Sequence, residues 1–299
     1  MKPILQAQSL GVNVLRKSWD LSWSALVWTT AWVVQVTSSF AAIPELALLD
    51  SGFRVEDLTA EDRMDWIRRQ GFAGVVVELS EPQWIRQTGE LADRMHVRLH
   101  GVRTSARLTR DALAVDPRLE GVVAALRGFP AAIWLVIHSG EFTRSSEVGD
   151  EIAVPELRKW ADRAAAAGTR VALLPAPGAW VERLDDALRL LRKAQHPQLG
   201  LVVNLGHWLR MGGRDPDSLF VEAGPWLWAM VIHGVTRSES NPASVRVVGL
   251  HEGDYDWAAV VQAGMRHGFT GVWCLQLPPV GDPVEILRAS VQAWRNKFP

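Results

Sequence analysis

Apolar runs of five to eight residues recur along the chain from about position 45, and polar stretches with a different periodicity separate them. Most runs are rich in Val, Leu and Ile and do not alternate with polar residues, which is typical of strands covered on both faces. Strands are therefore predicted at 45–49, 73–79, 97–103, 131–138, 170–175, 199–205, 227–234 and 271–277.

The stretches between these runs carry apolar residues at the spacing of amphipathic helices. Helices are predicted at 59–70, 82–95, 155–167, 181–194, 255–267 and 283–294. Pro155 is expected to open the third of them, and Asp254 is expected to be the N-cap of the helix at 255–267. The segment 211–224 is rich in glycine and predicts only a short helix.

Eight such cycles in about 250 residues predict one (β/α)8 TIM barrel over residues 43–299. An open, doubly wound sheet is the alternative, but no glycine-rich dinucleotide fingerprint follows the first predicted strand. The carboxyl ends of parallel strands meet at one rim of a barrel, and enzymes with this architecture carry their chemistry at that rim. Polar residues at the strand ends are therefore the candidate functional residues.

Seven residues at or just after predicted strand ends stand out for this reason. They are Glu78, His138, Trp180, Asn204, His207, His233 and Gln276. His233 is the strongest candidate because it ends an otherwise apolar strand, where a polar group must find partners. A solvated acid at Glu78, a structural turn histidine at His138 and a core tryptophan at Trp180 are the structural alternatives.

Composition excludes some partners and leaves others open. The 299 residues are 48% hydrophobic and have a formal net charge of -1, which gives no general affinity for nucleic acid. The single cysteine, Cys274, lies in a predicted strand, so we expect a buried hydrophobic side chain and no intrachain disulfide.

Residues 1–42 differ from the rest of the chain. Basic residues precede a largely apolar stretch at 21–34, and Ser39 and Ala41 have the spacing that a signal peptidase requires. We expect a signal peptide and export from the cytoplasm, with an interfacial anchor or a cytoplasmic protein as alternatives. The stretch is shorter than the roughly 20 apolar residues of a membrane span, so no stable span is expected.

Four segments together resemble the sugar phosphate isomerase/epimerase family of the xylose isomerase-like TIM barrel superfamily. These segments are 173–182, 199–208, 253–257 and 268–276, and the resemblance extends over about 45–297. It implies a TIM barrel that acts on a small carbohydrate or polyol derivative through an enediol-type intermediate. A small-molecule carbohydrate is the partner that it implies, and the formal net charge of -1 argues against nucleic acid.

The resemblance also implies a position for a divalent metal, held by a Glu after strand five, an Asp after strand six, a His after strand seven and a Glu after strand eight. Here those positions fall at 174–176, which has no carboxylate, and at Asn204, His233 and Gln276. A related group in the superfamily shares the Asn and Gln but has a histidine at the position of Ala176. Because Mg²⁺ and Mn²⁺ prefer anionic oxygen ligands, we expect no tight site and at most weak binding of Mg, Mn or Zn.

Two functions of different class are consistent with these residues. The first is an isomerase or epimerase in which His233, His207 and Glu78 are the candidate catalytic residues. The residues proposed to bind substrate are Asn204, Gln276, His138 and Trp180. The second is a carbohydrate-binding barrel that has lost catalysis. A DNA-repair nuclease on the same fold is a third, weaker interpretation, because it needs more histidines and acids and a basic face.

Overall fold

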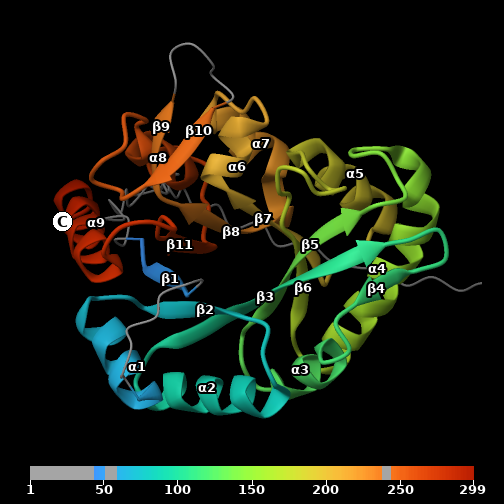
Figure 1. Ribbon diagram of the computed structural model, residues 1–299, viewed down its shortest axis with the longest axis horizontal. Helices are drawn as coiled ribbons and strands as arrows, with labels where there is room; N and C mark the ends of the chain where they lie inside the picture. The colour runs from blue at the N-terminus through green and yellow to red at the C-terminus, as the bar shows by residue number, and fades with distance from the viewer. Residues whose placement is uncertain (1–43, 51–58, 238–243) are drawn as a thin grey trace, which may run out of the picture. The chain divides into compact units, whose positions relative to one another are not determined.

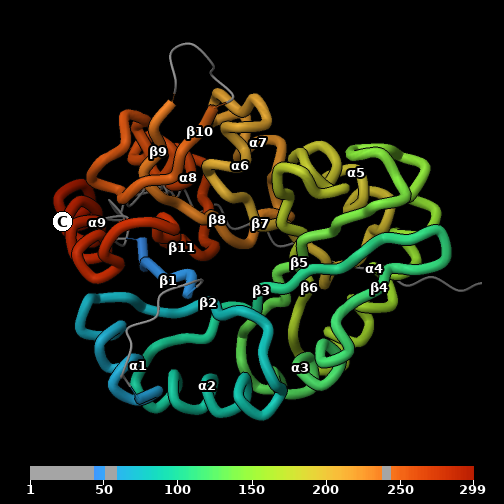
Figure 2. The backbone as a smooth tube through the Cα atoms, viewed as in Figure 1, coloured from blue at the N-terminus to red at the C-terminus, as the bar shows by residue number. Residues whose placement is uncertain are grey.

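Eight parallel strands form a closed ring in the computed structural model, which describes residues 44–50, 59–237 and 244–299. Each strand pairs with the next, and the last pairs with the first, with Leu46 opposite Trp273. Figure 2 shows the path of the backbone through these strands. The strands are β1 (Leu46–Asp50), β2 (Gly74–Glu78), β3 (Arg98–Leu108), β5 (Ala132–Ser139), β6 (Arg170–Leu173), β7 (Leu199–Asn204), β8 (Leu227–Ile232) and β11 (Val272–Gln276). The predicted TIM barrel is confirmed, whereas the predicted signal segment at 1–42 lies outside the described residues.

Helices surround this ring (Figure 1). They are α1 (Ala60–Arg69), α2 (Pro82–Arg94), α3 (Leu119–Ala125), α4 (Asp150–Ala166), α5 (Leu184–Ala194), α6 (Leu205–Arg210), α7 (Pro216–Ala223), α8 (Trp257–Arg266) and α9 (Pro283–Lys297). Short 3-10 turns, η1 (Glu147–Gly149) and η2 (Gly224–Trp226), precede α4 and β8. In the described part of the chain, no helix has the length and apolar character needed to cross a membrane.

Three features depart from the sequence prediction. Helix α4 begins at Asp150, so Pro155 lies inside it and removes one backbone hydrogen bond instead of opening the helix. The short strand β4 (Leu113–Val115) pairs antiparallel with the end of β3. A second sheet, β9 (Gly234–Arg237) with β10 (Val245–Val248), follows β8 and lies beside α6.

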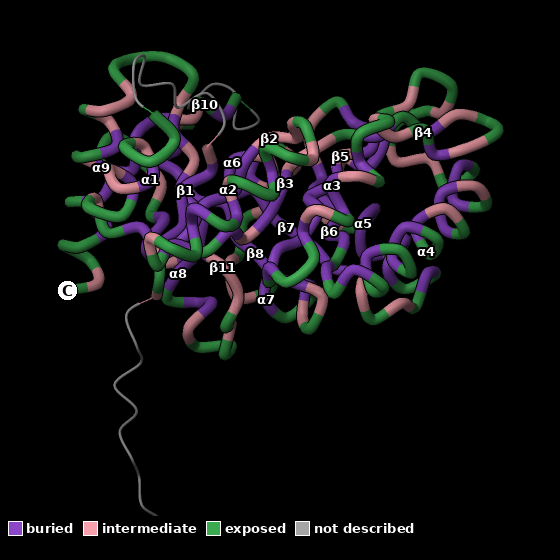
Figure 3. Tube along the Cα trace, turned by 90° about the horizontal axis from the view of Figure 1, so that it is seen from below, coloured by how far each residue is buried: buried purple, intermediate pink, exposed green. Residues whose placement is uncertain are grey.

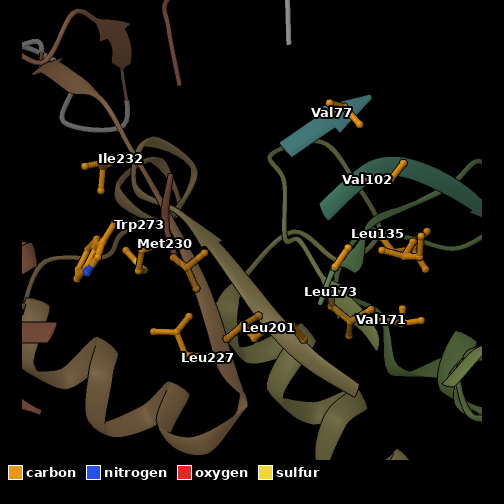
Figure 4. Close-up of a cluster of buried hydrophobic side chains, with 14 of the residues drawn as sticks. Val77, Val102, Leu135, Val171, Leu173, Leu201, Leu227, Met230, Ile232 and Trp273 are labelled. Carbon is orange, nitrogen blue, oxygen red and sulfur yellow. The ribbon is translucent and has the colours of Figure 1, made fainter. Parts of the chain in front are cut away.

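Alternate residues of the strands form two separate apolar layers. Outward side chains such as Leu135, Leu201 and Met230 pack against the helices (Figure 4). Inward side chains such as Val76, Val202 and Cys274 fill the barrel. Cys274 is fully buried and free, as predicted, and burial raises the pKa of its thiol. Figure 3 shows the buried strands inside a more exposed helical layer.

Candidate functional site

A cavity of about 810 Å³ opens at the ends of β2 and β11 and beside Arg103 of β3, and we call it the carboxyl-end cavity. Helix α6, strand β10 and the segment after β11 complete its wall. Its polar side chains are Glu78, Arg103, His207, Arg210, Arg246 and Gln276. Three residues selected at strand ends, Glu78, His207 and Gln276, therefore line one cavity.

Two amide side chains, Asn204 and Gln276, join β7 to β11 at this rim. The Nδ2 of Asn204 donates to Oε1 of Gln276 at 2.7 Å. Its Oδ1 accepts the backbone N–H of His207 at 3.1 Å, so Asn204 is also the N-cap of α6. Asn204 is only 4% exposed, and these bonds satisfy a polar group that would otherwise be costly to bury.

His233 lies behind Asn204 and is completely buried. Its Nδ1 is 3.1 Å from the carbonyl oxygen of Gly234, and its Nε2 is 3.2 Å from the backbone nitrogen of Gly206 and 3.1 Å from Oδ1 of Asn204. Burial lowers the pKa of His233 to about 4, so the ring is neutral at pH 7. With Nδ1 protonated toward Gly234, Nε2 accepts the N–H of Gly206.

The expectation that His233 faces a ligand directly is therefore wrong. A strand-end position identifies a residue near the rim, but the short hairpin of β9 and β10 follows it immediately and the ring is turned into the protein. The Nε2 of His233 lies 3.1 Å from Oδ1 of Asn204, but in the Nδ1–H tautomer both atoms are acceptors, so this contact is not a hydrogen bond.

His207 is the histidine that does line the carboxyl-end cavity. Its Nδ1 lies 3.2 Å from the carbonyl oxygen of Pro175. A carbonyl oxygen can only accept a hydrogen bond, so Nδ1 carries the proton and the ring is the Nδ1–H tautomer. The Nε2 lone pair is then available as an acceptor. Burial is the main cause that lowers the pKa of His207, with the positive charges of Arg210 and Arg103 adding to it, so the imidazole is neutral near pH 7.

Glu78 is held by Arg103, a residue that the sequence analysis did not select. Oε1 of Glu78 accepts from Nε of Arg103 at 2.8 Å and from Nη2 at 2.7 Å. Arg103 is the last residue of the predicted strand at 97–103, so the same strand-end criterion would have found it. Arg210 and Arg246 lie in α6 and in β10, where that criterion does not apply.

Two other candidates, His138 and Trp180, do not join this cavity. His138 is exposed near the end of β5, because β5 and its neighbour β3 extend beyond the rim. Trp180 is 1% exposed and packs against the backbone of Gly149, so it is a core residue and cannot stack on a ligand.

The donor set at this rim does not fit a tightly held divalent cation. Its members, Asn204, Gln276 and His233, are all neutral, and the strand-five position holds Leu174 and Pro175. Asp50 at the end of β1 pairs with Arg63 instead. No group of three His, Cys, Asp or Glu side chains that could hold a metal occurs among the described residues. Neutral amides offset little of the cost of dehydrating a dication.

Sequence comparison identifies the family of this chain. The family model described as xylose isomerase-like TIM barrel matches residues 65–297, and the chain belongs to this family. The resemblance noted from the sequence is thereby confirmed. No curated protein matches the chain.

Solved structures share the fold at low sequence identity. The apo 3-keto-D-glucoside 4-epimerase YcjR from E. coli is 14% identical over 85% of this chain and 99% of its own, with a TM-score of 0.66. The probable 3-DHS dehydratase AsbF from Bacillus anthracis is 17% identical over 84% and 99%, with a TM-score of 0.68. A xylose isomerase-like TIM barrel protein from Mycobacterium smegmatis in complex with magnesium is 15% identical over 86% and 98%, with a TM-score of 0.61.

Proposed function

We propose that this protein is a sugar isomerase or epimerase that binds a small carbohydrate derivative in the carboxyl-end cavity and works without a tightly bound metal. The observation that carries the proposal is that Glu78, His207 and Gln276 line one cavity at the catalytic end of the barrel. The 3-keto-D-glucoside 4-epimerase with the same fold supports the reaction class by analogy.

The charges around the cavity favour an acidic substrate. Arg103, Arg210 and Arg246 line it, and Glu78 is its one carboxylate among the described residues. Since Arg103 already pairs with Glu78, Arg210 and Arg246 are an excess of positive charge. Guanidinium groups bind phosphate and carboxylate through paired hydrogen bonds. The substrate class is therefore a sugar phosphate or sugar acid.

His207 is the proposed general base. Its neutral Nε2 can remove the proton from the carbon beside a substrate carbonyl, and the electron pair of that C–H bond then forms the C=C bond of an enediol(ate). The carbonyl oxygen gains negative charge in this step, and the amide of Gln276 and the guanidinium of Arg103 are the cavity groups suited to stabilise it. Return of the proton from His207 to the neighbouring carbon, on the same face, completes isomerisation, whereas epimerisation requires delivery of a proton to the opposite face of the same carbon.

A non-catalytic carbohydrate-binding barrel is the second candidate. One observation favours it: Oε1 of Glu78 is already engaged by Arg103, so no second base matches the two carboxylates that the resemblance implies. The amide of Gln276, which lines the cavity, is suited to sugar hydroxyl groups in either case, whereas Asn204 is 4% exposed and does not line it. The two candidates differ in whether a bound sugar exchanges its carbon-bound proton.

Deuterium incorporation distinguishes them. The protein is incubated in D₂O with EDTA and a panel of aldose phosphates, ketose phosphates and sugar acids, and incorporation at carbon is followed by proton NMR. We expect incorporation into at least one acidic sugar, and a loss of about 100-fold or more in His207→Gln, because a general base contributes at least that factor. The matched control is His196→Gln. His196 lies before the start of β7, and its side chain contacts Asp162 instead of the cavity, so this substitution should leave the rate unchanged.

Two outcomes contradict the enzymatic proposal. Tight binding of a sugar with no deuterium incorporation by the unaltered protein supports the binding barrel. Incorporation at an equal rate in His207→Gln removes His207 as the base.

A further inference from the structure

A second cavity, of about 950 Å³, lies at the opposite end of the barrel, and we call it the amino-end cavity. Five residues that begin their strands line it: Arg98, Ala132, Arg170, Leu227 and Val272. Enzymes with this fold carry their chemistry at the other end, and the proposed carbohydrate function does not use this cavity. Its volume falls within the range of small-molecule sites.

Aromatic rings form part of the inner surface of the amino-end cavity. Trp134 and Trp228 line it, and glycines on adjoining strands leave room for their rings. A β-carbon at Gly101 would lie 2.7 Å from Nε1 of Trp134, and one at Gly200 would lie 2.3 Å from the ring of Trp228. Trp134 is only 2% exposed and belongs to the core of the barrel, whereas Trp228 is half-buried, so Trp228 is the ring that a planar ligand can reach.

The charged side chains that line the amino-end cavity are arginines, and the lining His267 pairs with Asp217 at 2.9 Å. The ionisable residues that line the cavity are Arg98, His100, Arg170 and His267, and no Asp or Glu is among the described residues that line it. The guanidinium of Arg170 lies 4.7 Å from the ring centroid of Trp228. Arg98 approaches Glu45 only at 3.8 Å, with both side chains about two-thirds exposed (64% and 66%), so this pair neutralises little.

His100 adds a polar group that carries no charge at pH 7. It is largely buried, and burial together with the charge of Arg98 lowers its pKa to about 4. A neutral imidazole beside the guanidinium of Arg98 can donate one hydrogen bond to a ligand oxygen without adding repulsion between cations.

We propose that the amino-end cavity is a second binding site, for a small anion that carries a planar ring. Arg98 and Arg170 bind the oxyanion, and Trp228 contacts the ring. Guanidinium groups match phosphate and carboxylate equally in geometry. The shared chemistry therefore includes nucleoside monophosphates and aromatic carboxylates, and the two are separated by experiment.

Calorimetric titration of the full chain tests this site. The probes are adenosine 5′-monophosphate, benzoate, adenosine and inorganic phosphate. We expect one of the two ring-bearing anions to bind at least about tenfold more tightly than adenosine or phosphate, because neither of these offers both charge and ring. Which anion binds identifies the source of the oxyanion.

Variants locate the binding. Arg170→Gln and Arg98→Gln should each lower the affinity for the anion by about tenfold or more, because each removes a charged hydrogen bond. Arg163→Gln is the matched control, because Arg163 lies at the same 4.7 Å over the ring of Trp160, outside the cavity. Arg103→Gln, in the carboxyl-end cavity, should also bind as the unaltered protein does.

The proposal is overturned if neither ring-bearing anion binds at millimolar concentration, or if both Arg98→Gln and Arg170→Gln bind it unchanged. Loss of binding in Arg103→Gln would also overturn it, since it would place the anion in the carboxyl-end cavity. None of these outcomes bears on deuterium exchange by His207, so this proposal and the proposed function can fail separately.

Discussion

Asn204 connects the local structure of the barrel to its candidate site. Its side chain caps α6, donates to Gln276 and lies against the buried ring of His233. An aspartate in the same place could not donate to Gln276 and would add a negative charge with 4% exposure. The amide thus keeps this part of the rim neutral and hydrogen-bonded. It stands at the position where the resemblance implies a carboxylate that binds a metal.

The strand-end criterion was effective for residues at this scale, but it could not determine orientation. It selected Glu78, His207 and Gln276, which line the carboxyl-end cavity. It could not show that His233 turns inward, because that depends on the hairpin after β8. It also could not show that Trp180 packs under α4, because the contact with Gly149 joins residues 31 positions apart.

Burial of neutral histidines predicts a pH dependence of stability. The pKa of His233 is lowered to about 4 from an ordinary 6.5, and His100 behaves in the same way. Between these values the unfolded chain takes up protons that the folded chain does not. The stabilisation is therefore present above about pH 6.5 and is lost as the pH falls toward 4, by about 1.4 kcal/mol for each pKa unit.

Urea unfolding between pH 7 and pH 4.5 measures this effect. We expect the free energy of unfolding to fall with pH, and to fall less steeply in His233→Gln. His138→Gln removes an exposed histidine and should keep the original slope. A slope that is the same in His233→Gln and in the unaltered protein would contradict the assignment of His233 as a neutral buried group.

At the scale of the element, helix boundaries were predicted less well than the helices themselves. Asp254 was expected to cap α8, but the side chain of Asp256 accepts the N–H of Ala259 at 3.2 Å. The carboxylate of Asp254 instead accepts the N–H of Arg237 at 3.3 Å, which joins the loop to β9. The sequence could not show which of the two aspartates caps the helix, because the hairpin that Asp254 contacts was not predicted.

This difference predicts unequal effects of two matched substitutions. Asp256→Ala removes an N-cap and should lower the free energy of unfolding by about 1 kcal/mol. Asp254→Ala removes exposed hydrogen bonds and should cost about half as much or less. Urea midpoints compared at one pH give the answer, and a larger loss in Asp254→Ala would mean that the cap is assigned to the wrong residue.

For the whole molecule, the fold was predictable because its physical signal is repeated. Eight apolar runs without alternation require two covered faces, and a closed parallel barrel provides both. The short elements β4, β9, β10, α3 and α6 gave no comparable signal, since three to seven residues do not define a periodicity. The wall of the carboxyl-end cavity includes β10 and α6, so its shape could not be predicted from the sequence. Three of the residues that line it could be predicted.

The metal content of the purified protein tests the central claim, that the carboxyl-end site works without a tightly bound metal. Full-length protein and the double variant Asn204→Asp, Gln276→Glu are dialysed and analysed by inductively coupled plasma mass spectrometry. The two new carboxylates supply the anionic oxygens that divalent cations prefer, so the variant should retain more Mg, Mn or Zn. The account predicts well below about one equivalent in the unaltered protein. One equivalent that resists dialysis in the unaltered protein would contradict it.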